Sequence, residues 1–315
     1  MVNSRSCSVV VSVFNSEAGL NELIRRLEPV LSNLTDQHEL ILVNDGSADR
    51  SWDVIQRLAR EHPWVRGIDL MRNYGQHNAL LAGINSARFD TIVTMDDDLQ
   101  HPPEEIPRLL DTLNEGYDVV YGRPRKRSHS LWRNLASRLI KSVLKVTLGA
   151  EMGSHSSAFR AFRAPLRRGF TSFAGAQLSI DVLLSWSSKR VTHVLVEHDP
   201  RRIGTSGYSL SRLMVLALEL LTGYSALPLR IASLMGLSTS VVGLVMFAYV
   251  VVRRFTQTNY TPGFAFLAAE IAFFAGMQMF AIGVIGEYIA KLHFRTMGKP
   301  PYVVQEETGA HVLPE

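Results

Sequence analysis

The sequence contains a single cysteine, Cys7, among its 315 residues. An intrachain disulfide is therefore excluded, and a reducing compartment is indicated. The apolar run at 9–14 is too short for a signal peptide, and no cleavage-like site follows it. We therefore expect the water-soluble part of the chain to stay in the cytoplasm.

Glycine-rich phosphate loops are missing as well. The chain has no GxGxxG after its first predicted strand and no GxxxxGK followed by Ser or Thr. These absences argue against a classical dinucleotide-binding fold and against a P-loop nucleotide site. A nucleotide, if one binds, must be held by other means.

Acidic residues are scarce in one part of the chain, since 227–288 contains only Glu270 and Glu287. This unevenness separates a water-soluble part from a membrane part. Two apolar runs, 227–252 and 264–289, are each long enough to cross a bilayer of about 30 Å. The sequence therefore predicts two membrane-spanning helices near the C-terminus.

Basic residues outside the two predicted spans outnumber those between them. Before or beyond the spans lie Arg212, Lys291, Arg295 and Lys299, Arg230 lies at the start of the first span, and between the spans lie Arg253 and Arg254. By the positive-inside rule, both flanking parts face the cytoplasm, in a multi-pass protein of the inner, cytoplasmic membrane. The pI of about 9.3 is explained by this basic face against anionic lipid, so no nucleic-acid partner is expected.

Ahead of the first span, apolar residues recur at helical spacing in 206–226. They are Leu210, Leu213, Met214, Ala217, Leu218 and Leu221. Arg212 lies on another face of the same predicted helix. The pattern is typical of an amphipathic helix that lies in the membrane interface.

Strands alternate with helices in the part of the chain before residue 200. The β-branched run 8–13 reads as the first strand, further strands are predicted at 39–43, 65–70 and 91–95, and each precedes a helical pattern. Further strands are predicted at 118–121, 156–162 and 191–197. This order predicts an α/β fold with a doubly wound, mostly parallel sheet.

Three consecutive carboxylates, Asp96, Asp97 and Asp98, follow the predicted strand 91–95. Alternation at a strand end places Asp96 and Asp98 on one side, so the first and third can share one ion. With Gln100 close by, these oxygen ligands suit Mg²⁺ or Mn²⁺ better than Zn²⁺. The alternative is a solvated acidic turn that caps the following helix.

A basic segment, GRPRKRSHSLWRN, follows the predicted strand 118–121. Bidentate arginine side chains are well shaped for phosphate contacts. A solvated basic loop is the alternative explanation. The segment is close in the chain to the acidic residues, which favours a phosphate-binding role.

Three long motifs carry a resemblance over residues 8–304: MDDDLQHPPEEIPRLL, RNYGQHNALLAGI and GEYIAKLHFRTMGKPPYVV. With the paired C-terminal spans, the chain resembles membrane-anchored family 2 glycosyltransferases that load a sugar onto polyprenyl phosphate. The resemblance implies a cytoplasmic GT-A domain at 1–205, an interfacial helix at 206–226, two spans within 227–291 and a cytoplasmic tail at 292–315.

The resemblance also assigns residues to the nucleotide and its metal. It implies that the metal is held by Asp96, Asp98 and Gln100. It places around the nucleotide-sugar Val13, Phe14, Asn15, Glu17, Asp45, Asn73, Tyr74, Asp96 and Asp97. The chain departs from the family pattern at Ser12, which replaces a proline, and at Ser16, which replaces a glutamate. A UDP-sugar and a dTDP-sugar therefore both remain possible donors.

For the lipid phosphate, the resemblance implies four arginines: Arg123, Arg127, Arg160 and Arg201. Pro124 and Gly207 stand where the family has further basic residues. The expected catalytic set is Asp97, Asp98, Arg127 and Arg201. Relatives form tetramers, so a homo-oligomer is expected, and PPYVV near the C-terminus is suited to add a strand to a neighbour.

The resemblance thus implies inverting, metal-dependent sugar transfer from a nucleotide-sugar to undecaprenyl or another polyprenyl phosphate, for modification of lipopolysaccharide or another envelope glycan. A lipid phosphate is anionic near neutral pH, its second pKa being roughly 6, so a strong general base is less necessary. Asp97 and Asp181 are the remaining candidates for a base. Alternatives are transfer to a saccharide hydroxyl, for which a QxxRW sequence is missing, and a non-catalytic membrane adaptor.

Overall fold

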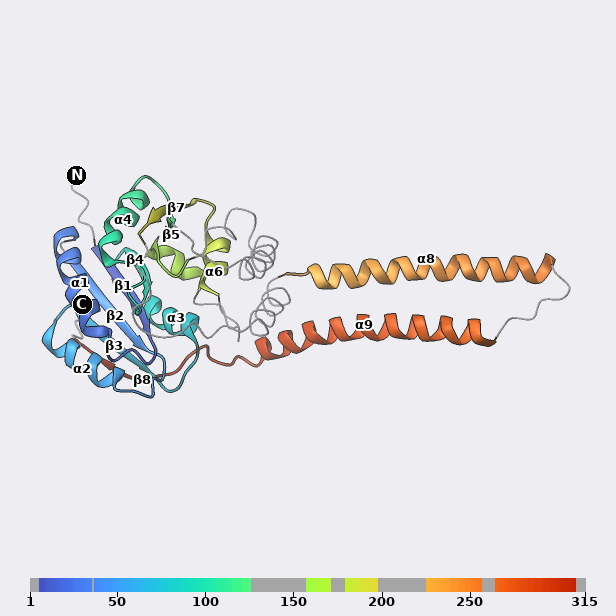
Figure 1. Cartoon of the computed structure of the whole chain (residues 1–315), viewed down its shortest axis with the longest axis horizontal. Coiled ribbons are helices and arrows are strands. Elements are labelled where there is room, and N and C mark those ends of the chain that lie inside the picture. The colour runs from blue at the N-terminus through green and yellow to red at the C-terminus, as the bar shows by residue number, and fades with distance from the viewer. Residues whose placement is uncertain are drawn as a thin grey trace. The chain divides into compact units, whose positions relative to one another are not determined.

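The computed structural model describes residues 6–35, 37–125, 157–170, 179–197, 225–256 and 264–309. The chain divides into two compact units (Figure 1). The first unit comprises Met1–Leu210 together with Gly298–Glu315, and the second comprises Ser211–Met297. The predicted interfacial helix at 206–226 falls almost wholly outside the described residues.

The described part of the first unit is built on one eight-stranded sheet, with the order β7-β5-β6-β4-β1-β2-β3-β8. Strands β6 and β8 run antiparallel to their neighbours, and the other pairs are parallel. The strands are β1 Ser6–Val13, β2 Gln37–Asn44, β3 Val65–Leu70, β4 Thr91–Asp96, β5 Val119–Pro124, β6 Arg160–Arg163, β7 Val191–Val196 and β8 Val304–Thr308.

Helices cover both faces of this sheet. On one face lie α1 (Leu20–Leu34), α2 (Ser51–Glu61) and α4 (Ile106–Asn114), the last preceded by the 3-10 turn η1 (Pro103–Glu105). On the other lie α3 (Gln76–Ser86), α6 (Ile180–Ser187) and the 3-10 segment η3 (Ala164–Gly169). The predicted doubly wound, mostly parallel α/β sheet is confirmed.

Alternation along β1 explains how one strand serves both faces. Val9, Val11 and Val13 pack with α1, whereas Val10 packs with α3. All four side chains are fully buried, as expected for a central parallel strand covered on both sides. The carboxyl ends of the parallel strands are thereby held at one edge of the sheet.

The C-terminal segment returns to the first unit as β8, which pairs antiparallel with β3. The Trp52 Nε1–H and the Gln56 Nε2–H of α2 donate hydrogen bonds to Glu306 at 3.3 and 3.1 Å. The Met71 N–H donates to the Val303 carbonyl at 3.0 Å. Val304, the last residue of PPYVV, begins β8, which extends the sheet of its own chain. The pairing of PPYVV with a neighbour stays a prediction.

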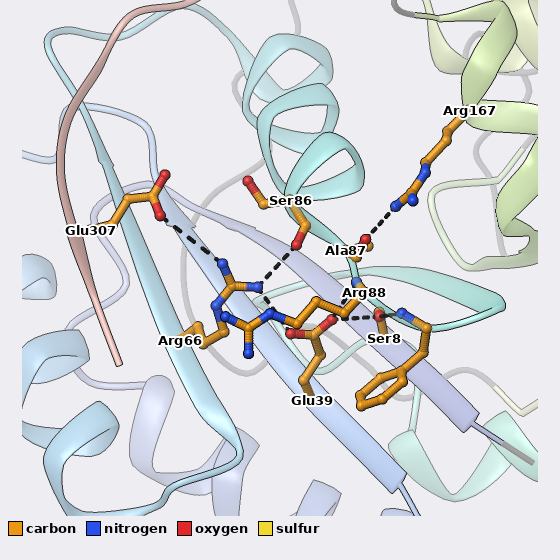
Figure 2. A network of polar contacts seen from close by, with 9 residues as sticks. Ser8, Glu39, Arg66, Ser86, Ala87, Arg88, Arg167 and Glu307 are labelled. Carbon is orange, nitrogen blue, oxygen red and sulfur yellow. Dashed lines mark hydrogen bonds and ion pairs between the residues drawn. The ribbon is translucent and has the colours of Figure 1, made fainter. Parts of the chain in front are cut away.

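A buried ionic network ties together the amino-terminal ends of β1, β2 and β3 (Figure 2). Glu39, 4% exposed, accepts hydrogen bonds from the Ser8 hydroxyl and the Arg88 N–H, each at 2.7 Å. Its other oxygen pairs with Arg66 Nη1 at 3.0 Å, and Arg66 also lies 4.0 Å from Glu307 of β8. The network thus reaches from β1 in the middle of the sheet to β8 at its edge.

The second unit contains the helices α8 (Leu227–Thr256) and α9 (Phe264–Thr296), which lie side by side (Figure 1). Two stretches, Leu227–Tyr249 and Phe273–His293, have mean hydropathies of 1.9 and 1.4 and are almost entirely exposed. Large apolar side chains such as Leu244 and Phe247 have no protein core to enter. These helices are long and apolar enough to cross a membrane, as the sequence predicts.

Candidate active site

The carboxyl ends of β1, β2 and β4 bring the predicted site residues to one edge of the sheet. The register places Ser12 of β1 opposite Asp96 of β4 and Val13 opposite Asn44 of β2. The residues that follow these strands therefore meet above the sheet. In open α/β sheets, ligands bind at this edge.

Asp96 and Asp97 turn to opposite sides, as strand alternation predicts. Asp96 Oδ1 accepts a hydrogen bond from Gln76 Nε2 of α3 at 2.5 Å. Asp97 Oδ2 accepts from the Phe14 N–H at 3.3 Å and from the Ser16 hydroxyl. Asp97 therefore fastens the β1–α1 loop, while Asp96 faces the beginning of α3.

A short turn after β4 fixes the side chain of Asp98, the third carboxylate of the motif. Asp98 Oδ1 accepts from the backbone N–H of Gln100 at 3.1 Å. Leu99 between them has a φ of 56°, an uncommon conformation for a residue with a branched side chain. Backbone held in such a region marks a site that the surroundings over-determine.

Burial makes ionisation of these carboxyls unfavourable. Burial first, and then the charges of Asp98 and Asp97, raise the pKa of Asp96 to about 6, while Arg160 and Gln76 oppose the shift. Burial also raises the pKa of Asp97, against the hydrogen bond from Ser16. A cation placed among these oxygens would relieve the repulsion.

The carboxylates present fit a divalent ion that takes its other ligands from elsewhere. Asp97 accepts from two groups of the β1–α1 loop, Asp96 accepts from Gln76, and Asp98 accepts from the Gln100 N–H. Asp96 and Asp98 are the pair that the sequence predicts for the metal. Within the described residues, no group of three or more His, Cys, Asp or Glu side chains is arranged around one point. One or two carboxylates completed by water and substrate phosphates are typical of Mg²⁺ sites.

Asp45 supports the loop that carries two of the predicted nucleotide contacts. Its two oxygens accept from the N–H groups of Tyr74 at 2.7 Å and Gly75 at 2.9 Å. Burial, to 2% exposure, raises its pKa, and the two N–H groups oppose the rise. Gly46 (φ 64°) lies so near that a Cβ there would stand 2.5 Å from the Asn73 nitrogen. The β2–α2 and β3–α3 loops are therefore locked together.

The β1–α1 loop is held by the loop after β2. The Asn15 N–H donates to the Ser47 hydroxyl at 3.0 Å, and its side-chain oxygen accepts from the Ala48 N–H at 2.8 Å. Glu17 accepts from the Arg50 N–H at 3.4 Å. Phe14, half exposed, is left facing away from the core. Asn15 and Glu17 thus shape the edge of the site, and their contact with a nucleotide stays a prediction.

Of the four arginines predicted to bind lipid phosphate, two lie within the described residues. Arg127 and Arg201 lie outside the described residues. Arg123 is half buried near the end of β5. Arg160 is only 1% exposed, donates from Nε to the Thr94 hydroxyl at 3.0 Å and forms an ion pair with Asp181. Its predicted contact with lipid phosphate therefore stays a prediction, and its visible partner is a carboxylate.

Sequence reasoning did not predict several polar contacts of this region. Gln76 and Ser16 hold the two sides of the acidic motif, and Thr94 and Asp181 hold Arg160. Gln76 stands directly after the Gly75 turn in RNYGQHN, which was the available signal for its position. The pairing of Arg160 with Asp181 joins residues from β6 and α6, and no sequence spacing indicates it.

The doubly wound sheet carries a cluster of carboxylates after β4, at the edge where enzymes of this architecture bind their ligands. The family described as Glycosyl transferase family 2 matches residues 8–170, and the one described as GtrB C-terminal hairpin matches 227–292. The chain belongs to glycosyltransferase family 2 and is an enzyme of that family. With its apolar hairpin, it is a membrane-associated protein.

Characterised relatives extend over nearly the whole chain. The undecaprenyl-phosphate 4-deoxy-4-formamido-L-arabinose transferase of Proteus mirabilis is 37% identical over 305 residues, covering 96% of this chain and 94% of the relative. The enzyme of the same name from Photorhabdus laumondii is 35% identical, covering 97% and 95%. The resemblance found in the sequence is thereby confirmed.

A solved structure shares the fold of the first unit. Glucosyl-3-phosphoglycerate synthase from Mycobacterium tuberculosis, in complex with Mn²⁺ and UDP-glucose, aligns with a TM-score of 0.50. It is 20% identical, and the alignment covers 69% of this chain and 77% of that one. At this identity the likeness concerns the fold alone.

Proposed function

We propose that this enzyme transfers a sugar from a nucleotide-sugar, UDP- or dTDP-linked, to undecaprenyl or a related polyprenyl phosphate. The observation that carries the proposal is the full-length similarity, acidic motif and apolar hairpin included, to relatives named as undecaprenyl-phosphate transferases. The product would be a lipid-linked sugar for lipopolysaccharide or another envelope glycan. We place the catalytic unit at the cytoplasmic face of the inner membrane, in a homo-oligomer.

The donor would be held through a divalent metal, Mg²⁺ or Mn²⁺, at the carboxyl edge of the sheet. Asp96 and Asp98 supply two oxygens, and the donor diphosphate would supply others. The metal would stabilise the charge that develops on the leaving diphosphate. Gln100 is placed next to Asp98 by its backbone N–H, so its amide can contribute from the same turn.

The acceptor requires little activation. A phosphate oxygen of the lipid attacks the anomeric carbon as the bond to the donor's β-phosphate oxygen breaks, which inverts the configuration. Because the acceptor is already anionic, no proton need be removed. Asp97 is engaged with Phe14 and Ser16 and so orders the donor loop. Arg123, Arg127 and Arg201 are the proposed cations for the two phosphates.

Stabilisation by metal is expected to increase with pH. The pKa of Asp96 in the folded protein, about 6, exceeds the usual aspartate pKa of 3.8. In the metal-free protein, the contribution of Asp96 to stability is therefore fully present below pH 3.8 and is lost as the pH rises through 6. Metal binds the ionised form, so apparent Mn²⁺ affinity should be about tenfold weaker near pH 5 than near pH 7. Unfolding temperatures with and without Mn²⁺ at both pH values measure this. An equal rise in unfolding temperature on adding Mn²⁺ at pH 5 and at pH 7 would contradict this expectation. Asp96→Asn should abolish the difference between the two pH values.

The direct test uses the purified full-length protein in detergent with Mn²⁺, undecaprenyl phosphate and a panel of UDP- and dTDP-sugars. Mass spectrometry of the lipid fraction should show one lipid-linked monosaccharide with one donor. Transfer to an added oligosaccharide, with no lipid product, would favour action on a saccharide hydroxyl. Nucleotide binding without any product across the panel would favour the adaptor.

A further inference from the structure

A group of buried polar side chains lies beneath the acidic motif, on the sheet face covered by α3 and α6. Its members come from three strands and two helices, and we call them the Arg160 cluster: His77, Thr94, Tyr121, Arg160 and Asp181. In the sheet register, Arg160 of β6 stands opposite Thr94 of β4 and opposite Tyr121 of β5. The three strands therefore present these side chains in one row.

The cluster is connected through Arg160. Arg160 Nε donates to the Thr94 hydroxyl at 3.0 Å, and Thr94 donates in turn to the Ala158 carbonyl at 2.8 Å. Nη1 of Arg160 pairs with Asp181, in the first turn of α6. Thr94 and Arg160 have 0% and 1% of their surface exposed. A cation so enclosed is bound by the protein and is not presented to solvent.

His77 links the first turns of α3 and α6. Burial lowers its pKa, which favours the neutral ring, and the Ile180 N–H is 3.5 Å from Nδ1, in position to donate to it. Tyr121 is fully buried near the charges of Asp181 and Arg160, and burial raises its pKa well above the usual value. The cluster thus joins two helix starts to the centre of the sheet.

Two routes lead from the cluster to Asp96. Thr94 precedes Asp96 by two positions on β4, so both side chains lie on the same face. Gln76, the neighbour of His77, donates to Asp96 at 2.5 Å. The positive charge of Arg160 also opposes the effect of Asp98 and Asp97 on Asp96.

We propose that Arg160 is a positioning residue of the metal and diphosphate site, and that Asp181 is its counter-ion. Arg160 holds the end of β4 and the first turns of α3 and α6 together and balances the charge of the acidic motif. This role differs from direct contact with lipid phosphate, and it leaves Asp181 no part in removing a proton. The inference rests on the proposed function, since it concerns the same site.

The test measures Mn²⁺ affinity together with kinetics. Arg160→Met in the full-length protein should weaken Mn²⁺ binding in the presence of UDP about 10- to 100-fold, the range for residues that orient metal ligands. Electron paramagnetic resonance of free Mn²⁺ gives this value without turnover. The KM for undecaprenyl phosphate should stay unchanged. Arg160→Lys should recover part of the affinity, because it keeps the charge but loses the planar fork.

A matched control separates positioning from general stability. Arg66→Met removes another buried arginine from an ion pair with a carboxylate, at the opposite ends of the strands (Figure 2). It should leave Mn²⁺ affinity unchanged. If Arg160→Met does not fold, the double variant Arg160→Met/Asp181→Leu removes both charges together, which proteins tolerate better than one unpaired charge. It should show the same loss of Mn²⁺ affinity.

Three results would overturn the inference. The first is unchanged Mn²⁺ affinity in Arg160→Met or the double variant, with a raised KM for the lipid, which would place Arg160 at the acceptor. The second is a loss of Mn²⁺ affinity in Arg66→Met equal to that in Arg160→Met. The third is Asp181→Asn abolishing turnover with Mn²⁺ affinity intact, which would make Asp181 a base. Absence of product from the wild-type protein would refute the proposed function, and the Mn²⁺ titration would still decide the role of Arg160.

Discussion

Replacing Asp98 by asparagine is expected to reduce turnover by roughly a thousandfold or more and to abolish metal-dependent nucleotide binding at the same time. A metal acting on a leaving diphosphate contributes several kcal/mol to the transition state, and each 1.36 kcal/mol is about tenfold in rate. Asp98 and Asp96 are the two carboxylates proposed to hold the metal, whereas Asp97 accepts from the β1–α1 loop. Isothermal titration with UDP, with and without Mn²⁺, and lipid product formation measure the two effects.

The matched control is Asp53→Asn, the same change at an exposed position in the first turn of α2. It should leave both measurements within twofold of the unchanged protein, as surface substitutions have small effects, within about 0.5 kcal/mol. If Asp98→Asn kept metal-dependent UDP binding, the metal would have to lie elsewhere. If Asp98→Asn lost metal-dependent UDP binding but kept turnover, the metal would help to bind the nucleotide without stabilising the transition state.

Replacing Glu39 by leucine is expected to lower the free energy of unfolding of the first unit by about 3 kcal/mol, because the largely buried Arg66 would lose its carboxylate partner at 3.0 Å and keep only the Ser86 carbonyl at 2.9 Å and Glu307 at 4.0 Å. The Ser8 hydroxyl and the Arg88 N–H would lose their acceptor as well (Figure 2). All four tryptophans of the sequence lie within the first unit. Tryptophan fluorescence during urea unfolding therefore follows this unit alone.

The double variant Glu39→Leu/Arg66→Met provides the comparison. Removing both charges should destabilise the unit by less than the sum of the single changes, since neither charge is left unpaired. Turnover at temperatures below unfolding should be retained, because the network lies at the amino ends of the strands. A loss below about 1 kcal/mol in Glu39→Leu, the usual value for an exposed pair, would show that water reaches Arg66.

Local sequence patterns predicted the strands and helices whose own residues are enough to determine their structure. The run 65–70 became β3 with the predicted bounds, because a β-branched strand between turns needs no distant information. The opposite directions of Asp96 and Asp97 followed from alternation alone. The polar strand β8 could not be predicted, since its residues become a strand only by pairing with β3.

The candidate site was predictable in position but not in its internal contacts. Asp45 ends a strand in the sequence as in the structure, but its hydrogen bonds to Tyr74 and Gly75 depend on the close approach of two loops. Arg160 is predicted from the resemblance to contact lipid phosphate, and only the packing of α6 on the sheet reveals its pairing with Asp181. Contacts between segments distant in sequence need three-dimensional information.

The pairing of β8 with β3 has a consequence for biosynthesis. Residues 304–308 leave the ribosome after both apolar helices, although they complete a sheet whose other strands are made much earlier. Until then the N–H and C=O groups of β3 on that side have no strand partner, and an open edge invites pairing with other chains. The nascent first unit therefore reaches its final, protected form only when the membrane hairpin has been synthesised.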